Sequence, residues 1–236
     1  MAAYKAILFD LDDTLYDFSG NWQQALRKTF REHPLTAELD QPSVVEAFNR
    51  YSTLHWSLVH GGTITFDQYR FKRLASALAD HGIELGEEAF GHFNASFIDN
   101  NLQLIHPEES VIRQMVRWAE HCRLGIITNG PADLAEEKVK RLGLEALIPA
   151  NHIVVSEKAG FFKPQPEIFR YGLDKLGVQS HEAVFVGDSW QDDVMGAVNA
   201  GIAAVWLDKN GKTMPDHPAC QPLGIIRHIS EAGAYL

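Results

Sequence analysis

Residues 4–14, YKAILFDLDDT, decide the fold, because a short apolar run ends directly in a group of aspartates. A continuous apolar run of about four to eight residues is typical of a strand buried on both faces of a sheet. Similar runs recur at 124–127, 153–155, 183–186 and 203–207. Helical patterns lie between them, at 108–121, 131–142, 166–176 and 192–200. This alternation predicts an α/β protein with a doubly wound parallel sheet.

One long interval interrupts the alternation. Between residues 16 and 106 the sequence carries helical patterns and no convincing buried strand, and glycines such as the Gly61-Gly62 pair punctuate it. We therefore expect a discontinuous core made of residues 1–15 and 107–236, with residues 16–106 forming an inserted helical domain. The length of 236 residues fits this division, since domains usually hold roughly 100–200 residues.

Composition excludes several classes of protein. A content of 45% hydrophobic and 22% charged residues is that of a soluble globular chain, which excludes disordered, fibrous and membrane proteins. The net charge, 21 minus 31 or −10, repels a nucleic-acid polymer.

The two cysteines, Cys122 and Cys220, lie far apart and outside any C-x-x-C spacing, so neither a disulfide framework nor a zinc site is indicated. Residues 6–11 are too short for a signal peptide, and we expect a cytoplasmic protein without membrane partners.

Polar residues follow the predicted strands, at the edge where open α/β sheets bind their ligands. These residues are Asp10 and Asp12 after the first strand, Thr128 and Asn129 after the second, Asp188 and Asp193 after the fourth, and Lys163 before the helix that follows the third. Carboxylates that converge on one crevice repel each other, and a hard divalent cation such as Mg²⁺ would hold them ionised together. The sequence therefore predicts a magnesium site.

The same set of residues suits a phosphoryl group. Asp10 and Asp12 are two residues apart and would point the same way if the strand stayed regular, so that one can act as nucleophile and the other as acid or base. A hydroxyl from Thr128 and a fixed cation from Lys163 would stabilise the phosphoryl oxygens. For Asp188 alone, a helix-capping role is the simpler interpretation.

Four motifs in order, DLDDTL (10–15), ITNG (127–130), KPQPEIF (163–169) and VGDSWQDDVMGA (186–197), resemble the signature motifs of the haloacid dehalogenase superfamily. The resemblance implies that the catalytic residues are Asp10 as nucleophile, Asp12 as general acid and base, Thr128 as the motif-two hydroxyl and Lys163 as the motif-three lysine. It implies that the substrate is bound by Thr128, Asn129 and Lys163. It also implies that Mg²⁺ is held by Asp10, Asp12, Asp188 and Asp193, with Asp188 as a direct ligand and Asp193 more often reached through water. Lys158 is the alternative lysine, but Lys163 precedes Pro164 as the family pattern requires. Asp13 departs from the glycine that is commoner at its position.

The resemblance also bears on the reaction. Dehalogenases of this superfamily carry a tyrosine where this chain has Asp12, so an aspartate there favours hydrolysis of phosphate esters. We expect a Mg²⁺-dependent phosphohydrolase that forms an aspartyl-phosphate on Asp10. A phosphomutase using the same residues and a non-catalytic binding protein on the same fold remain as alternatives.

The inserted helices resemble the C1 cap of the superfamily, which closes over the site and sets specificity. The segment HWSLVHGGTITFDQYRF (55–71) is similar to that of pyrimidine 5′-nucleotidase-type members. The implied substrate is a small phosphate ester, a nucleoside 5′-monophosphate or alternatively a sugar phosphate, phosphoglycolate or flavin mononucleotide. Aromatic and basic residues of the insertion are candidates for substrate contact or for packing: Trp22, His55, Trp56, Tyr69, Arg70 and Arg73.

Overall fold

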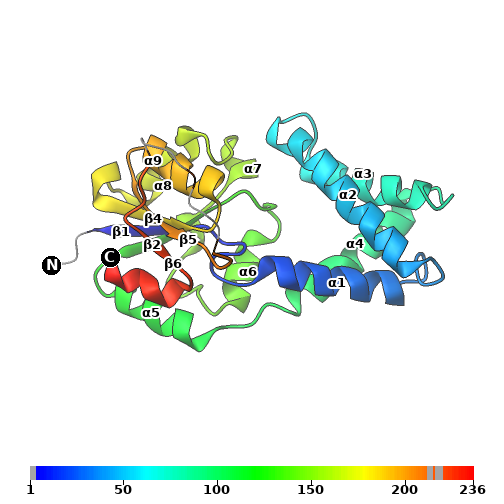
Figure 1. Cartoon of the computed structure of the whole chain (residues 1–236), viewed down its shortest axis with the longest axis horizontal. Helices are drawn as coiled ribbons and strands as arrows, with labels where there is room; N and C mark the ends of the chain where they lie inside the picture. The colour runs from blue at the N-terminus through cyan, green and yellow to red at the C-terminus, as the bar shows by residue number, and fades with distance from the viewer. Residues whose placement is uncertain (1–3, 212–214, 216–219) are drawn as a thin grey trace. The chain divides into compact units, whose positions relative to one another are not determined.

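The computed structural model describes residues 4–211, 215 and 220–236. The chain divides into two compact units, one made of Met1–Phe18 with His106–Leu236 and the other of Ser19–Ile105. The first unit contains the sheet and the second is helical (Figure 1). Each unit has an apolar core of its own.

Within the described residues the first unit holds a parallel sheet of six strands, in the order β3-β2-β1-β4-β5-β6. The strands are β1 (Ala6–Phe9), β2 (Arg123–Thr128), β3 (Ile153–Val155), β4 (Ala183–Gly187), β5 (Ala203–Leu207) and β6 (Gly224–Ile226). The predicted doubly wound parallel sheet is therefore confirmed. The strand β6 was not predicted, because it has three residues and one of them, Ile225, is 43% exposed, so the segment lacks the buried apolar run of the other strands.

Helices cover both faces of the sheet (Figure 1). Helices α8 (Pro166–Leu176) and α9 (Gly196–Asn199) lie on one face, and α5 (Glu109–Ala119) lies on the other together with the C-terminal 3₁₀ segment η4 (Ile229–Ala234). The shorter helical elements of this unit are α6 (Ala135–Arg141), α7 (Ser156–Ala159), η1 (Ala150–His152), η2 (Ser180–Glu182) and η3 (Trp190–Met195). The order of the strands reverses direction between β1 and β4, which places a crevice at their carboxyl ends.

The helix predicted over 192–200 has a different geometry. It begins as a π-helical turn, η3, and continues as the short helix α9. The Ser189 hydroxyl accepts a hydrogen bond from the backbone N–H of Asp192, and the backbone N–H of Ser189 donates to the Asp193 carboxylate at 2.9 Å. These two bonds draw Asp193 back toward the end of β4. π-Turns of this kind are frequent at functional sites.

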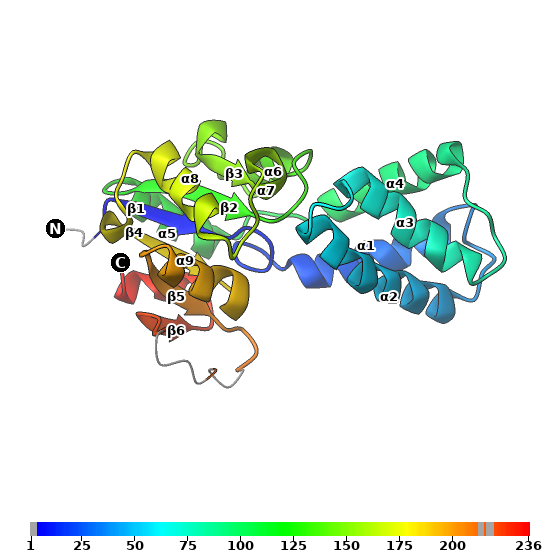
Figure 2. The same cartoon turned by 90° about the horizontal axis from the view of Figure 1, so that it is seen from above.

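The second unit contains α1 (Phe18–Glu32), which begins one residue before it, and α2 (Gln41–His60), α3 (Phe66–Ala79) and α4 (Glu87–Leu102) (Figure 2). Its core is rich in aromatic rings, with Phe30 edge-on to Phe48 at 5.4 Å and to Phe93 at 5.0 Å between centroids. Helix α3 begins with a capping box in which Thr65 and Gln68 each bond the other's backbone N–H. Over the residues that the structure describes, no helix is both long and apolar enough to cross a membrane.

The packing of α8 on the sheet depends on a glycine in β2. A Cβ atom on Gly125 would lie 3.0 Å from side-chain atoms of both Leu176 and Leu8, and 3.2 Å from the backbone oxygen of His152. A valine suits a strand by intrinsic preference, but here there is no room for it. We expect Gly125→Val to lower the free energy of unfolding of this unit by about 1–3 kcal/mol, the usual cost of overpacking.

Chemical denaturation followed by circular dichroism measures this change. The matched control is Ile225→Val at an exposed position of β6, for which we expect a change within about 0.5 kcal/mol. Equal stability of Gly125→Val and the wild-type protein would show that α8 does not pack as closely on β2 as described.

Candidate active site

The site lies at the carboxyl ends of β1 and β4. Asp10 directly follows β1, is almost fully buried, and is fixed by its backbone N–H, which donates to the oxygen of Val186 in β4 at 3.0 Å. Asp188 directly follows β4. Because β1 and β4 are parallel neighbours, with Phe9 opposite Val186, the two carboxylates emerge side by side at the point where the strand order reverses.

Three of the expected acidic residues form one cluster. Carboxylate oxygens of Asp10, Asp188 and Asp193 all lie within 4.8 Å of one another. The Thr14 hydroxyl lies between the first two, 3.2 Å from Asp10 Oδ2 and 3.3 Å from Asp188 Oδ1. Thr14 was not singled out from the sequence, although its place at the end of the first motif could have drawn attention to it.

Lys163 is the cation of this cluster. Its ammonium lies 2.6 Å from Asp10 Oδ1 and 2.6 Å from Asp193 Oδ1, and the side chain is 3% exposed. The amide of Asn129 holds the backbone of Lys163 on both sides, since it accepts from the Lys163 N–H at 2.9 Å and donates to the Lys163 oxygen at 3.0 Å. Both ends of the Asn129 amide are thus engaged in positioning Lys163. The alternative, Lys158, is exposed and lies 3.9 Å from Glu136, away from the cluster.

A glycine allows Asp193 to reach the cluster. A Cβ atom on Gly187, the last residue of β4, would lie 2.4 Å from Cγ of Asp193. Asp193 therefore occupies the space of a missing side chain. Its Oδ1 accepts from Lys163 and its Oδ2 from the Ser189 backbone, so protein donors already contact both of its oxygens.

Burial and like charges govern the ionisation of the cluster. Burial raises the pKa of Asp10 well above its ordinary value, and the charges of Asp193 and Asp188 add to this effect while Lys163 opposes it. Burial, with the charges of Asp193 and Asp13, raises the pKa of Asp188 to about 6. Burial would lower the pKa of Lys163, but the charges of Asp10 and Asp193 outweigh it and raise that pKa. Three carboxylates with one ammonium leave an excess of negative charge.

The cluster suits a hard divalent cation by its donor set. Magnesium is bound through one or two carboxylates together with waters and phosphate oxygens. Asp188 is partly exposed, and the described bond to its carboxylate comes from a neutral hydroxyl, that of Thr14. Asp10 Oδ2 likewise has the Thr14 hydroxyl as its described partner. These two residues are therefore the ones best suited to direct ligation, and Asp193 is better suited to contact through water.

Asp12 is not one of the three carboxylates that form the acidic cluster. The strand β1 ends at Phe9, Asp12 forms an isolated bridge with Tyr16, and Asp13 adopts a left-handed conformation with φ of 61°. The period-two argument for the direction of Asp12 assumed a strand that stays regular, and this condition is not met because β1 ends before Asp10. The left-handed conformation explains why glycine is commoner at the position of Asp13.

The Asp12 carboxylate has partners that the sequence did not indicate. Lys138 of α6 lies 2.7 Å from its Oδ1 and 2.9 Å from its Oδ2, and the Tyr16 hydroxyl donates to Oδ1. Burial and the charge of Asp12 raise the pKa of Tyr16, so the phenol stays a donor. Nearby, Thr128 is buried at the end of β2, and its hydroxyl oxygen accepts from the N–H of Gly130 at 3.0 Å.

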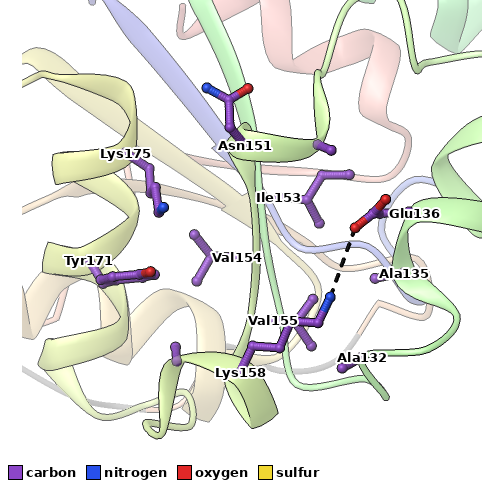
Figure 3. Close-up of a pocket in the computed structure, with 12 residues that line it drawn as sticks. Ala132, Ala135, Glu136, Asn151, Ile153, Val154, Val155, Lys158, Tyr171 and Lys175 are labelled. Atoms are coloured by element: carbon purple, nitrogen blue, oxygen red, sulfur yellow. Dashed lines mark ion pairs between the residues drawn. The ribbon is translucent and has the colours of Figure 1, made fainter.

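A separate pocket lies at the β3 edge of the sheet (Figure 3). It has a volume of about 170 Å³, and α6, α7 and α8 contribute to its walls. The charged side chains that line it are Glu136, Lys158 and Lys175. None of the residues expected at the active site lines it, so this pocket is distinct from the carboxylate cluster.

A family model described as haloacid dehalogenase-like hydrolase matches residues 4–201. The chain belongs to this family. It is therefore an enzyme of a hydrolase family, as the four motifs implied.

Relatives and solved structures differ in their named reactions. The pyrimidine 5′-nucleotidase YjjG of Escherichia coli K12 is 28% identical over 211 residues, which cover 89% of this chain and 88% of YjjG. The HAD-hydrolase YfnB of Bacillus subtilis, solved with magnesium, matches with a TM-score of 0.77 at 24% identity and covers 98% of this chain and 97% of its own. A structure of a 2-haloacid dehalogenase from Pseudomonas syringae pv. Tomato DC3000 has a TM-score of 0.72 at 29% identity and covers 98% and 97%.

The raised pKa of Asp188 has a consequence for stability. A carboxyl group titrates near 4 in an unfolded chain and at about 6 for folded Asp188, so the folded state binds the proton more tightly. The stabilisation is complete below about pH 4 and is lost as the pH rises through 6. We therefore expect the melting temperature of the metal-free protein in EDTA to fall between pH 5 and pH 7.5.

Asp188→Asn tests the origin of this dependence. The variant should melt higher than the wild-type protein at pH 7.5 and show a smaller change with pH. Glu145→Gln, at an exposed position outside the helices and strands, is the control and should follow the wild-type curve. Parallel curves for Asp188→Asn and the wild-type protein would assign the pH dependence to other groups.

Proposed function

We propose that the protein is a Mg²⁺-dependent phosphohydrolase that cleaves small phosphate monoesters through an aspartyl-phosphate on Asp10. The observation that carries the proposal is the arrangement around Asp10. Its carboxylate is buried at the end of the central strand, 2.6 Å from the Lys163 ammonium and within 4.8 Å of the other two acids. A fixed nucleophile beside a fixed cation is what in-line attack on a phosphoryl group requires.

Each side chain has a task in this reaction. Asp10 attacks phosphorus, a bond forms between its carboxylate oxygen and phosphorus, and the bond to the leaving oxygen breaks. Asp12 enters this step protonated and gives its proton to that oxygen. As a carboxylate it then accepts a proton from the water that attacks phosphorus, while the bond between phosphorus and the Asp10 oxygen breaks and inorganic phosphate leaves. Lys163 and the Thr128 hydroxyl donate to the phosphoryl oxygens, the latter because its own oxygen already accepts from Gly130. Asn129 keeps Lys163 in place.

Asp10 and Asp188 would bind the magnesium ion directly, and Asp193 would contact it through water. Asp12 would be the fourth acidic residue of the magnesium site. When bound, the ion balances the negative charge of the cluster and of the phosphoryl group. The excess of carboxylates over ammonium groups in the cluster supports this role.

Asp12 favours phosphate esters over haloacids. A dehalogenase expels a halide, which needs no proton, whereas an alkoxide leaving group does. An aspartate with an oxygen open to a ligand is fit to supply that proton, and the side chain of Asp12 is 20% exposed. A phosphomutase would use the same residues, and analysis of the products separates it from a hydrolase.

The substrate that we propose is a nucleoside 5′-monophosphate, with sugar phosphates, phosphoglycolate and flavin mononucleotide as alternatives. The similarity to the pyrimidine 5′-nucleotidase YjjG over most of both chains supports this choice. The core residues address the phosphoryl group, which all these substrates share. Discrimination between them therefore falls to the helical unit Ser19–Ile105.

A metal and variant assay tests the reaction. Phosphate release from an aryl phosphate should stop in EDTA and return with Mg²⁺, while Ca²⁺ should inhibit because its larger, flexible shell allows Asp10 to bind through both oxygens. Asp10→Asn should abolish turnover. Asp12→Asn should lose roughly 10²–10⁴-fold and retain more on esters with good leaving groups.

Two results would contradict the proposal. Full activity of the wild-type protein in EDTA would show that the reaction does not depend on a metal ion. Rates of Asp10→Asn close to wild type would exclude the covalent aspartyl-phosphate.

A substrate panel tests the choice of nucleotides. Trp56 lies half-buried in the helical unit, 5.7 Å from the Phe66 ring and 5.5 Å from the Tyr69 ring. If it stacks on a base, Trp56→Ala should raise KM for nucleotides by about 5- to 150-fold, equivalent to ~1–3 kcal/mol of stacking, and leave an aryl phosphate unaffected. Equal loss on both substrates, with the fold intact by circular dichroism, would give Trp56 a packing role.

A further inference from the structure

Lys138 is a buried cation that the proposed phosphoryl site does not use. It belongs to α6, its side chain is 3% exposed, and its ammonium contacts both oxygens of Asp12. Lysine is almost never buried to this extent unless it is paired. Within the described part of the chain, Asp12 is the carboxylate with which it forms an ion pair.

Aromatic rings complete the surroundings of this ammonium. Its Nζ lies 4.9 Å from the centre of the Phe18 ring and 5.9 Å from that of Tyr16. Such rings stabilise a cation and exclude water from it. Lys138 is thereby held between a carboxylate on one side and aromatic faces on the other, which restricts where its ammonium can move.

The two carboxylate oxygens of Asp12 accept different numbers of hydrogen bonds. An ionised carboxylate has about four directions in which it accepts hydrogen bonds. Lys138 and Tyr16 occupy two of them at Oδ1, and Lys138 occupies one at Oδ2. A direction therefore stays open at Oδ2.

The space beside Oδ2 is also kept clear. A Cβ atom on Gly130 would lie 3.0 Å from Oδ2, so a larger residue would crowd this oxygen. Gly130 directly follows Thr128 and Asn129, the residues expected at the phosphoryl group.

We propose that Lys138 is a positioning residue that fixes the Asp12 carboxylate so that Oδ2 faces the reacting group. This inference rests on the proposed phosphohydrolase function and deepens it. Asp12 transfers a proton to the leaving oxygen in the first step and takes one from water in the second. A carboxylate that rotates freely would meet these partners in a productive orientation less often.

The test compares two variants. Lys138→Met keeps most of the length of the side chain and removes its charge and hydrogen-bond donors, whereas Lys138→Arg keeps the charge and the donors. Lys140→Met changes an exposed lysine of the same helix and is the matched control. Each is assayed with Mg²⁺ on an alkyl phosphate and on 4-nitrophenyl phosphate. Circular dichroism verifies the fold, and Lys138→Gln replaces Lys138→Met if that variant does not fold.

For Lys138→Met we expect kcat on the alkyl phosphate to fall by roughly 10–100-fold, with KM changed less than about 3-fold, because a displaced acid or base affects the chemical step. On 4-nitrophenyl phosphate, kcat/KM should change little, since this leaving group needs no proton. A rapid burst of nitrophenol should appear or grow, because the aspartyl-phosphate then waits for poorly activated water. Lys138→Arg should recover at least part of kcat, and Lys140→Met should match the wild-type protein.

A double variant separates positioning from a general effect. Adding Lys138→Met to Asp12→Asn should cost little further activity if Lys138 acts through Asp12. The positioning role would be overturned if the activity losses of the two single variants multiplied in the double variant. It would also be overturned if Lys138→Met lost equal activity on both esters without a burst. In either case the phosphohydrolase function would stand. A wild-type protein that releases no phosphate from either ester would instead overturn the proposed function itself.

Discussion

The ammonium of Lys163, placed 2.6 Å from both Asp10 and Asp193, is the interaction on which the site depends. It joins residues that are 153 and 30 positions away in sequence, and so ties the end of β1 to the turn after β4. Without this cation, the buried carboxylates of Asp10 and Asp193 would face each other beside the partly exposed Asp188, and the loss of one partner of a buried pair commonly costs about 3–5 kcal/mol. The clamp of Asn129 on the Lys163 backbone extends the same constraint to the end of β2.

The backbone is shaped to permit this arrangement. Gly187 leaves the space that the Asp193 side chain fills, and the π-turn Trp190–Met195 delivers that side chain to it. The indole N–H of Trp206 donates to the backbone oxygen of Asp188 at 3.0 Å, which anchors the start of the same turn to β5. The hydrogen bonds of Ser189 to Asp192 and Asp193 hold this turn in place. The local backbone geometry and the buried charges therefore support each other.

The sequence predicted the sheet and most of the residues that meet in the site for a definable reason. Buried parallel strands are continuous apolar runs, and the residues directly after them must gather at one edge, so Asp10, Thr128 and Asp188 could be found by position. Lys138 could not, because it sits among other charged residues of α6, where a solvated lysine is the normal expectation, and its burial depends on tertiary contacts. The left-handed conformation of Asp13 was not predicted, although the glycine that is commoner at its position is a signal for it.

Asp10 and Asp12 show how one short segment can supply two different carboxylates. Asp10 is buried among acids whose charges add to the burial and raise its pKa, and it shares its one ammonium with Asp193. Asp12 pairs with the ammonium of Lys138, accepts a hydrogen bond from the Tyr16 phenol, and is partly open to solvent. Environments that separate paired acids in this way assign them separate tasks. The excess of negative charge around Asp10 suits a cation, whereas the charge of Asp12 is balanced by the ammonium of Lys138. The two environments stay distinct because different lysines, Lys163 and Lys138, pair with the two aspartates, although only one residue separates Asp10 from Asp12 in sequence.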